Sequence, residues 1–197
     1  MHLRIFAPVV SAVVLGVSFV DVVGTATLPA GASPTSTESI ATAPTQGLLT
    51  PTQAHQLGFK QVVSKPASSK QTRIAGCGTG AEAAYENKSN HSGLVTEVLV
   101  CRSTSASAAV LATAAKLGSA SSAGKPPAQL GSGAIERWTD ATTVAIYWQR
   151  GTVVELLGLD VNVNASTSSH SRSARHLTAK QRKTLSAGAV EQNANLT

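Results

Sequence analysis

Two runs rich in valine, isoleucine, leucine and aromatic residues follow one another within residues 135–163 and meet at Arg150-Gly151. Short apolar runs joined by a glycine-containing dipeptide are typical of a β-hairpin. Both faces of the predicted hairpin are mainly apolar, so we expect it to lie centrally in a sheet that helices cover on one side. The cross-strand pairs expected from a two-residue turn are Trp148 with Val153, Ile146 with Glu155 and Val144 with Leu157.

Three further runs predict other elements. Residues 94–101 are rich in valine and leucine and are bounded by small polar residues, which indicates a strand. Residues 135–138 predict another short strand, followed by a turn at residues 139–142. An alanine-rich segment after Cys101 predicts a helix that ends at Gly118. The apolar face of this helix is expected to consist of Val110, Leu111, Ala114 and Leu117.

Two segments carry the same signal for the start of a helix. Thr50 and Thr178 each stand three residues before a glutamine, which is the spacing of a capping box. Pro51 occupies the first helical position of the earlier segment, where its missing N–H costs nothing. Glycine is the residue that most often follows a helix, so we expect these helices to stop at Gly58 and Gly188.

The N-terminus has the pattern of an export signal. Arg4 precedes an uncharged, mainly apolar run over residues 5–20, and Ala30-Gly31-Ala32 supplies the small residues that a signal peptidase requires. A membrane-spanning helix needs about 20 predominantly apolar residues. Because Asp21 closes the run early and Pro8 lies inside it, we expect cleavage and secretion, with an uncleaved N-terminal anchor as the alternative.

The rest of the chain divides by composition. Residues 33–47 are rich in serine, threonine and proline and predict a solvated linker after a signal peptide at residues 1–32. A folded domain is expected at residues 48–188, and residues 189–197 show no pattern that would order them. The predicted class is α+β, with a small antiparallel sheet flanked by two or three helices.

The composition makes a covalent brace valuable. Only 4% of residues are aromatic although 42% are hydrophobic, so the core must be built from alanine, valine and leucine and will be small. Cys77 and Cys101 are the two cysteines of a chain expected in an oxidising compartment, and we therefore predict a disulfide between them. Closing a loop of this length stabilises a domain by roughly 3 kcal/mol in the chain-entropy model.

No arrangement of residues predicts catalysis, a cofactor or a metal ion. The glycines of GCGTGAE at residues 76–82 fit neither a dinucleotide-binding fingerprint nor a P-loop. Ser132 lacks the spacing of a nucleophile elbow. The histidines lie in polar surroundings. The carboxylates that could serve glycoside cleavage are scattered along strand and turn positions, where we expect them to promote solubility: Glu136, Asp140, Glu155 and Asp160.

Positive charge is concentrated in one region of a chain with a net charge of +6. The window of residues 170–183 holds no acid and is flanked by histidines. Its five cations form a possible anion-binding surface: Arg172, Arg175, Lys180, Arg182 and Lys183. The cluster is either a solvated surface or a site for an anionic envelope polymer or membrane surface. Nucleic acid is not expected, because no aromatic residue is interleaved with these charges to stack on bases.

Three aromatic residues near the predicted hairpin allow two interpretations. Trp138, Tyr147 and Trp148 either fill the core or line an open cleft, since alternation along a strand does not distinguish the two. A cleft would favour a binding site or an active site, whereas a filled sheet would favour a structural protein.

The order of these elements resembles that of exported actinobacterial envelope proteins, including small lipoproteins and the extracellular sensor domains of membrane kinases. The resemblance covers roughly residues 48–188 and rests on these segments: LLTPTQA, the cysteine-ended strand with its alanine-rich helix, LGSGAIERW, IYWQRGTVVELLGL and LTAKQRKTL. It implies an α+β fold with disulfides that binds or senses something outside the cell. This chain differs in lacking a lipobox, a kinase domain and a second cysteine pair.

These observations together predict a secreted, non-enzymatic binding or interaction domain at the cell envelope, without a cofactor. Two alternatives stay open at this point. One is a hydrolase that acts on envelope material, and the other is a structural surface protein retained by its basic C-terminal region.

The export prediction can be checked directly. N-terminal sequencing of protein recovered from the medium should begin near Ser33, because Ala30-Gly31-Ala32 precedes that residue. An intact Met1 in the membrane fraction would instead mean that the signal is kept as an anchor.

Overall fold

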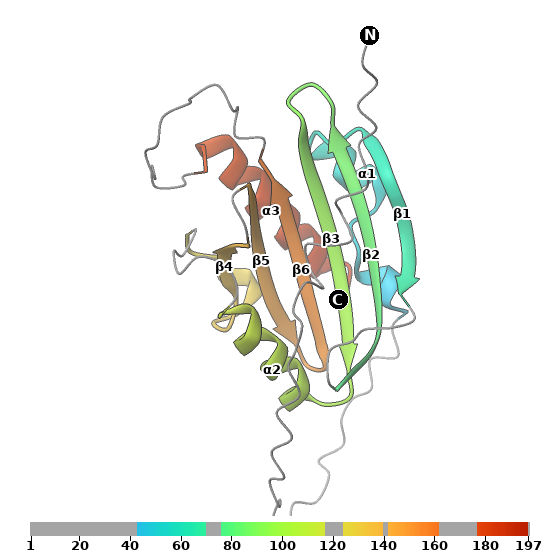
Figure 1. The fold of residues 1–197 in the computed structure, drawn as a ribbon, viewed down its shortest axis with the longest axis vertical. Helices are drawn as coiled ribbons and strands as arrows, with labels where there is room; N and C mark the ends of the chain where they lie inside the picture. The colour runs from blue at the N-terminus through green and yellow to red at the C-terminus, as the bar shows by residue number, and fades with distance from the viewer. Residues whose placement is uncertain (1–42, 70–75, 117–123, 140–141, 162–176, 197) are drawn as a thin grey trace, which may run out of the picture. The chain divides into compact units, whose positions relative to one another are not determined.

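A single antiparallel sheet of six strands forms the centre of the structure (Figure 1). The computed structural model describes residues 43–69, 76–116, 124–139, 142–161 and 177–196, which belong to one compact unit. The strand order is β1-β2-β3-β6-β5-β4. The strands are β1 (Gln61–Ser69), β2 (Cys77–Asn87), β3 (Ser92–Cys101), β4 (Ile135–Trp138), β5 (Thr143–Arg150) and β6 (Val153–Asp160).

Within the described residues, three α-helices and two short 3-10 helices accompany the sheet, so the predicted α+β class is confirmed. The helices are α1 (Pro51–Gln56), α2 (Thr104–Ala114) and α3 (Ala179–Ala194), with 3-10 helices η2 (Pro44–Gly47) and η3 (Ala128–Leu130). Both predicted capping boxes are present, and the backbone N–H groups of Thr50 and Thr178 each donate to the side chain of a glutamine at 2.8 Å.

The two faces of the sheet differ in what covers them. We call the side that packs against η2, α1 and α3 the helix face, and the other side the open face. Side chains of the helix face form the core, together with residues of the helices and loops above them. Strand members of this core are Ala81, Ala83, Tyr85, Leu94, Val98, Trp138, Val144, Ile146, Trp148, Val153, Leu157 and Leu159. On the open face, α2 packs against β3, β5 and β6.

The domain is longer at both ends than the sequence pattern predicts. Helix α3 runs past Gly188 to Ala194, and Ala189 and Leu196 are buried, so the prediction of an unpatterned tail from residue 189 is wrong. Gly188 does not end the helix. A Cβ there would lie 2.8 Å from Leu157 Cδ2, so the absence of a side chain lets α3 approach the sheet closely. Residues 44–47, predicted as linker, form η2 and pack on β2 and β3.

The central hairpin has the predicted faces but a different register. Arg150 pairs with Val153, and Trp148 pairs with Glu155, so the strands are shifted by two residues from the expected pairs. The turn is Gly151-Thr152 rather than Arg150-Gly151. Gly151 has a φ of 57°, which suits the first central position of a primed hairpin turn. A shift of two preserves which residues share a face, because side chains alternate with a period of two.

Strands β1 and β2 are the two strands of the described sheet that the sequence pattern missed. The segment from Cys77 to Asn87, predicted as a loop closed by a disulfide, is an eleven-residue strand in a hairpin with β3. Its alanine, glycine and glutamate residues have low intrinsic strand preference. Pairing on both sides with β1 and β3 therefore decides its conformation.

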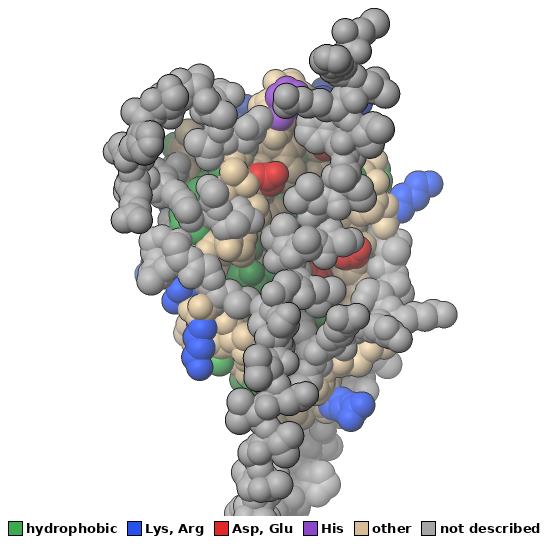
Figure 2. All heavy atoms as spheres, viewed as in Figure 1, with side chains coloured by type: hydrophobic (Ala, Val, Ile, Leu, Met, Phe, Trp, Pro, Cys, Tyr) green, Lys and Arg blue, Asp and Glu red, His purple; other side chains and the backbone are tan. Residues whose placement is uncertain are grey.

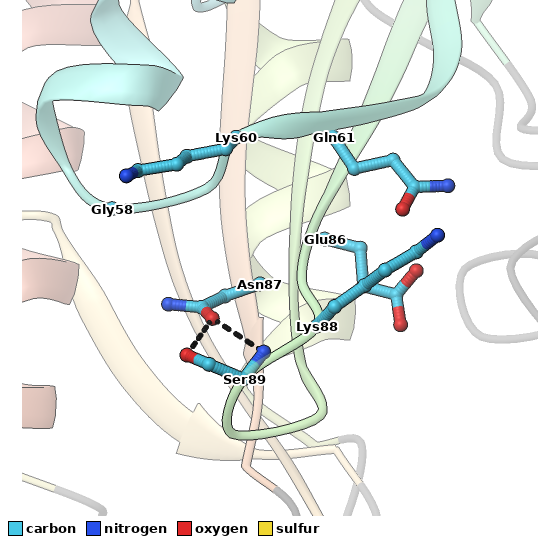
Figure 3. Close-up of a pocket in the computed structure, with 7 residues that line it drawn as sticks. All are labelled: Gly58, Lys60, Gln61, Glu86, Asn87, Lys88 and Ser89. Carbon is cyan, nitrogen blue, oxygen red and sulfur yellow. Dashed lines mark hydrogen bonds between the residues drawn. The ribbon is translucent and has the colours of Figure 1, made fainter.

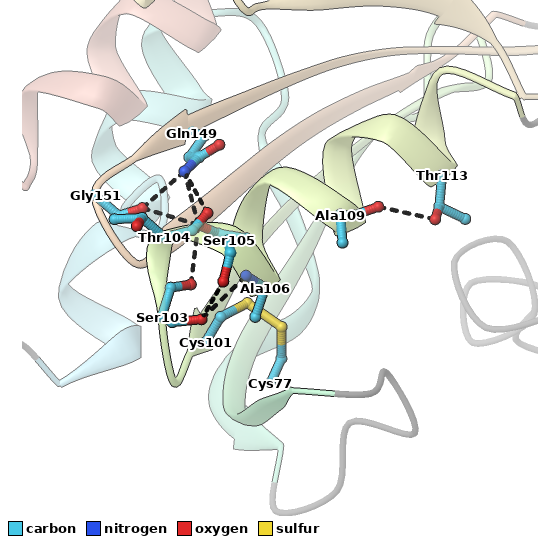
Figure 4. The surroundings of a disulfide bond; sticks show 11 residues. Cys77, Cys101, Ser103, Thr104, Ser105, Ala106, Ala109, Thr113, Gln149 and Gly151 are labelled. Atoms are coloured by element: carbon cyan, nitrogen blue, oxygen red, sulfur yellow. Dashed lines mark hydrogen bonds between the residues drawn. A yellow bond between two sulfur atoms is a disulfide. The ribbon is translucent and has the colours of Figure 1, made fainter. Parts of the chain in front are cut away.

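The disulfide closes the base of this hairpin (Figure 4). Cys77 and Cys101 are register partners on β2 and β3, which confirms the predicted bridge. Helix α2 starts at Thr104, three residues after Cys101, with Ser103 as its cap. Its buried Ser107 hydroxyl donates to the backbone oxygen of Gly151 at 2.9 Å. The bridge, the helix and the central turn are thus joined at one end of the sheet.

Removal of the disulfide should destabilise the domain without changing its fold. We expect the Cys77→Ala/Cys101→Ala protein to lose about 3 kcal/mol of unfolding free energy in urea, because the unfolded chain regains the entropy of the open loop. Mass spectrometry of the unreduced wild-type protein checks that the thiols are linked. Two free thiols, or equal stability of the two proteins, would contradict a bracing role.

Candidate binding site

A polar hollow of about 400 Å³ lies at the end of the sheet where β1 begins and β2 ends (Figure 3). None of its lining residues was singled out as a site by the sequence pattern. The segment before β1 and the tip of the β2–β3 hairpin form its walls. The lining residues are Gly58, Lys60, Gln61, Glu86, Asn87, Lys88 and Ser89. We call this site the hairpin hollow.

The C-terminal end of α1 positions the segment that forms one wall of the hairpin hollow. Gly58 has a φ of 98°, and its N–H donates to the backbone oxygen of His55 at 3.0 Å. Phe59 N–H donates to the backbone oxygen of Ala54 at 2.9 Å. These two bonds are those of a Schellman motif, and the buried Phe59 ring anchors the chain after it. Lys60 is therefore held at the rim.

Two short side-chain turns shape the opposite wall. Asn87 Oδ1 accepts hydrogen bonds from the Ser89 backbone N–H at 3.0 Å and from its hydroxyl at 2.6 Å. Asn90 Oδ1 accepts from the Ser92 backbone N–H at 3.2 Å and hydroxyl at 2.6 Å. The Asn87 amide nitrogen points away from these bonds, on the same side as Lys60 in Figure 3. The wall is thus ordered by the asparagines and still presents N–H donors.

The charge of the hairpin hollow is mixed, with an excess of one positive charge. Lys60 and Lys88 contribute two cations and Glu86 one anion, while the amide of Gln61 adds neutral donors and an acceptor. Both lysines are exposed. Ammonium and amide N–H groups donate to anionic oxygens, and a carboxylate accepts from hydroxyl groups. The lining can therefore bind a small, very polar molecule that carries an acid group.

The predicted basic surface is only partly within the described residues. Arg172 and Arg175 lie outside them, whereas Lys180 and Lys183 are exposed on α3. Arg182 has a structural partner, because its Nη1 lies 3.0 Å from Glu136 Oε1 on β4. This ion pair ties α3 to the edge of the sheet and occupies one of the five cations that the sequence grouped as a surface.

The aromatic residues do not form a cleft. Trp138 and Trp148 are 2% and 0% exposed and belong to the core on the helix face, so the cleft interpretation is wrong for both. Tyr147 is on the open face and is 8% exposed. The reason is the pleat of β4 and β5, which turns the two tryptophans towards the helices and Tyr147 away from them.

Glu136 and Glu155 are buried rather than exposed as expected. Glu155 is 0% exposed in the core, and one carboxylate oxygen accepts from Trp148 Nε1 at 3.0 Å. Burial raises the pKa of Glu155 to about 8, although the Trp148 hydrogen bond and the charge of Arg150 lower it. Burial also raises the pKa of Glu136, against the lowering effect of Arg182. The alternation that places Glu155 beside Trp148 was the only sequence signal for this burial. Asp160, by contrast, is exposed, and Asp140 lies outside the described residues.

Comparison of the chain with family models, with curated proteins and with solved structures finds no match. The resemblance to exported actinobacterial envelope proteins therefore stays a prediction. Within the described residues, no group of three histidine, cysteine, aspartate or glutamate side chains could hold a metal ion. No helix in the same part of the chain is long and apolar enough to cross a membrane.

Glu155 should make stability fall as pH rises. Its pKa of about 8 in the folded state exceeds the ordinary value of 4.5, so between these values the folded protein holds a proton that the unfolded chain has released. In that range, each pH unit of increase lowers the free energy of unfolding by up to about 1.4 kcal/mol. We expect Glu155→Gln to unfold at higher urea concentration than wild type at about pH 9, with the difference shrinking towards pH 5. A difference that does not change with pH would contradict this assignment.

Proposed function

We propose that this protein is a non-enzymatic binding domain of the cell envelope, and that the hairpin hollow binds an acidic sugar of an envelope polymer. The observation that carries this proposal is that Lys60 and Lys88 line one hollow of about 400 Å³ together with amide and hydroxyl groups. That volume is within the usual range of ligand pockets, about 300 to 1,000 Å³.

The chemistry of the lining favours a sugar over an apolar ligand. Every side chain that lines the hairpin hollow is polar or charged. Lysine ammonium groups are compact point charges that suit phosphate or carboxylate oxygens. Glu86 and Gln61 supply acceptors for the hydroxyl groups that surround such an acid group in a sugar. A ligand with one anionic group and several hydroxyl groups therefore satisfies both kinds of lining residue.

The hairpin hollow is also better suited to binding than to hydrolysis. Glycoside hydrolases position two carboxylates on either side of the bond that they cleave. Glu86 is the one carboxylate among the lining residues of the hairpin hollow. With a single acid and no histidine in the lining, the site can hold an anionic sugar but has no acid–base pair. We therefore place binding before the hydrolase alternative.

Export to the cell envelope supports the choice of ligand. The N-terminal pattern around Arg4 and Ala30-Gly31-Ala32 predicts secretion, and the Cys77–Cys101 disulfide is of the kind that persists in oxidising compartments. A chain with a net charge of +6 attracts anionic polymers by its field. The proposal combines this location with the chemistry of the hairpin hollow.

A second candidate rests on the exposed lysines of α3. Lys180 and Lys183 lie in its first two turns and are exposed. They would hold an anionic surface by charge alone, as expected for a structural protein retained by its basic region. Such binding would show little preference among anionic sugars.

Two double variants with equal charge change separate these candidates. Isothermal titration with glucuronate and with glucose 6-phosphate should show affinity about tenfold lower for Lys60→Gln/Lys88→Gln than for wild type, because the ammonium groups are lost from the site. Lys180→Gln/Lys183→Gln is the matched control and should stay within about twofold of wild type. The opposite ranking would support the basic surface, and equal losses would show binding by net charge only.

A further inference from the structure

Two carboxylates face each other on the open face of the sheet. Glu82 on β2 and Glu97 on β3 are register partners. The helix face holds their neighbours Ala83 and Val98, so both glutamates point to the opposite side. Directly paired residues of antiparallel strands have Cβ atoms about 4.5 to 5.5 Å apart. We call these residues the glutamate pair.

The glutamate pair is unfavourable unless a cation joins it. Like charges directly opposite each other destabilise a sheet. Glu97 is only 9% exposed, and its carboxylate makes no hydrogen bond or ion pair with any residue that the structure describes. Burial removes part of the hydration of such a carboxylate, and no hydrogen bond or ion pair compensates for the loss. Glu82 is exposed, so one member of the pair is accessible from solvent.

The surroundings of the glutamate pair are apolar. Leu156 on β6 is the cross-strand partner of Glu97, and Val95 and Leu99 flank Glu97 on the same face of β3. Leu156 and Leu99 are buried. Figure 2, which views this face, shows hydrophobic side chains and Asp or Glu side chains on it. A ligand that satisfies this surface must combine a positive group with apolar neighbours.

We propose that the glutamate pair binds an arginine or lysine side chain of a protein partner, presented by a segment whose neighbouring residues are apolar. Charge complementarity supports the cation, and Leu156, Val95 and Leu99 support the apolar segment. A guanidinium is the better fit, since it is weakly hydrated and its planar fork can donate to two carboxylates. The net charge of +6 repels cations at long range, so any attraction must come from these local groups.

A divalent metal ion is the less suitable occupant. Calcium requires six to eight oxygen ligands and magnesium a near-ideal octahedron. The glutamate pair offers two carboxylates in an apolar setting, and the described residues form no group of three potential ligands. A single organic cation needs only the two carboxylates, which makes it the occupant that this geometry favours.

Binding to the glutamate pair should tighten as pH rises through neutrality. Burial, together with the charge of Glu82, raises the pKa of Glu97 to about 7. A cation favours the ionised carboxylate, so it binds better where Glu97 is already ionised. The other ionisable groups on the open face of the neighbouring strands are Glu86 on β2, Asp160 on β6 and Tyr147 on β5. Protonation of Glu97 is the change that dominates near pH 7.

The proposal can be tested with a blocked pentapeptide that has one arginine between alanine and leucine residues. Backbone amide chemical shifts of β2 and β3 in full-length protein, which are observable in every variant, report its binding. We expect affinity about tenfold lower for Glu97→Gln and for Glu82→Gln than for wild type, and lower at about pH 6 than at about pH 8. A peptide with neutral citrulline in place of arginine should bind the wild-type protein about tenfold more weakly than the arginine peptide does. Glu191→Gln on α3 removes the same charge elsewhere and should match wild type.

Four results would overturn the proposal. Equal binding of the citrulline peptide would show an apolar contact only, and equal losses in Glu97→Gln and Glu191→Gln would show an effect of net charge. Saturable shifts of the Glu97 carboxyl with calcium chloride would assign a metal ion. Tighter peptide binding by Arg172→Gln/Arg175→Gln would mean that the chain's own basic residues compete for the pair. The Lys60→Gln/Lys88→Gln protein separates this test from the hairpin hollow. It should bind the peptide with the affinity of wild type.

Discussion

The attachment of α3 to the sheet is the constraint on which the rest of the structure depends. Gln192 is 0% exposed, and its amide can be satisfied only by groups of the sheet. Its oxygen accepts from the Thr96 hydroxyl at 2.8 Å, and its nitrogen donates to the backbone oxygen of Glu97 at 3.1 Å. Thr96 also accepts from the backbone N–H of Leu49 at 3.3 Å. One buried network therefore joins the last helix, a central strand and the segment before α1, and α3 can dock in only one register without leaving polar groups unpaired.

The β2–β3 hairpin connects this core with both proposed binding surfaces. Its base is held by the Cys77–Cys101 bridge, and its strands pair over most of their length. The hairpin hollow lies at its tip, and the glutamate pair lies between the tip and the bridge. Strand pairing fixes such side chains more firmly than a loop would, which reduces the entropy lost on binding. One rigid element can thus present an anion site and a cation site on the same molecule.

The buried acids show how the same residue type acquires different properties from its position. Glu136 has an arginine partner at the sheet edge, Glu155 has a tryptophan N–H in the core, and Glu97 has no described partner on the open face. Burial raises the pKa of all three. Glu136 and Glu155 each have one partner within the domain, although the Oε2 atom of each carboxylate is buried without a hydrogen bond. Glu97 has no such partner among the described residues, and this is the observation on which the proposed cation site rests.

Local signals in the sequence determined much of this fold. Hydrogen-bonding residues at fixed spacing were sufficient for the starts of α1 and α3, because a capping box is complete within four residues. The local sequence was also sufficient to predict the strand at Ile135–Trp138 and the disulfide. Tertiary structure alone decided that β2 is a strand, that α3 continues through Gly188 and that the tryptophans are buried.

The candidate sites were decided at the same tertiary level. The hairpin hollow joins Lys60 to Lys88, and the glutamate pair joins Glu82 to Glu97, through strand pairing between separate segments. The sequence contains each of these residues but not their register. A shift of one residue between β2 and β3 would turn one glutamate to the helix face, and nothing in the local pattern excludes it. The sequence by itself therefore determined the capped helix starts, the central strands and the disulfide. Long-range pairing determined β1, β2 and which side chains meet, since cross-strand neighbours are set by global packing.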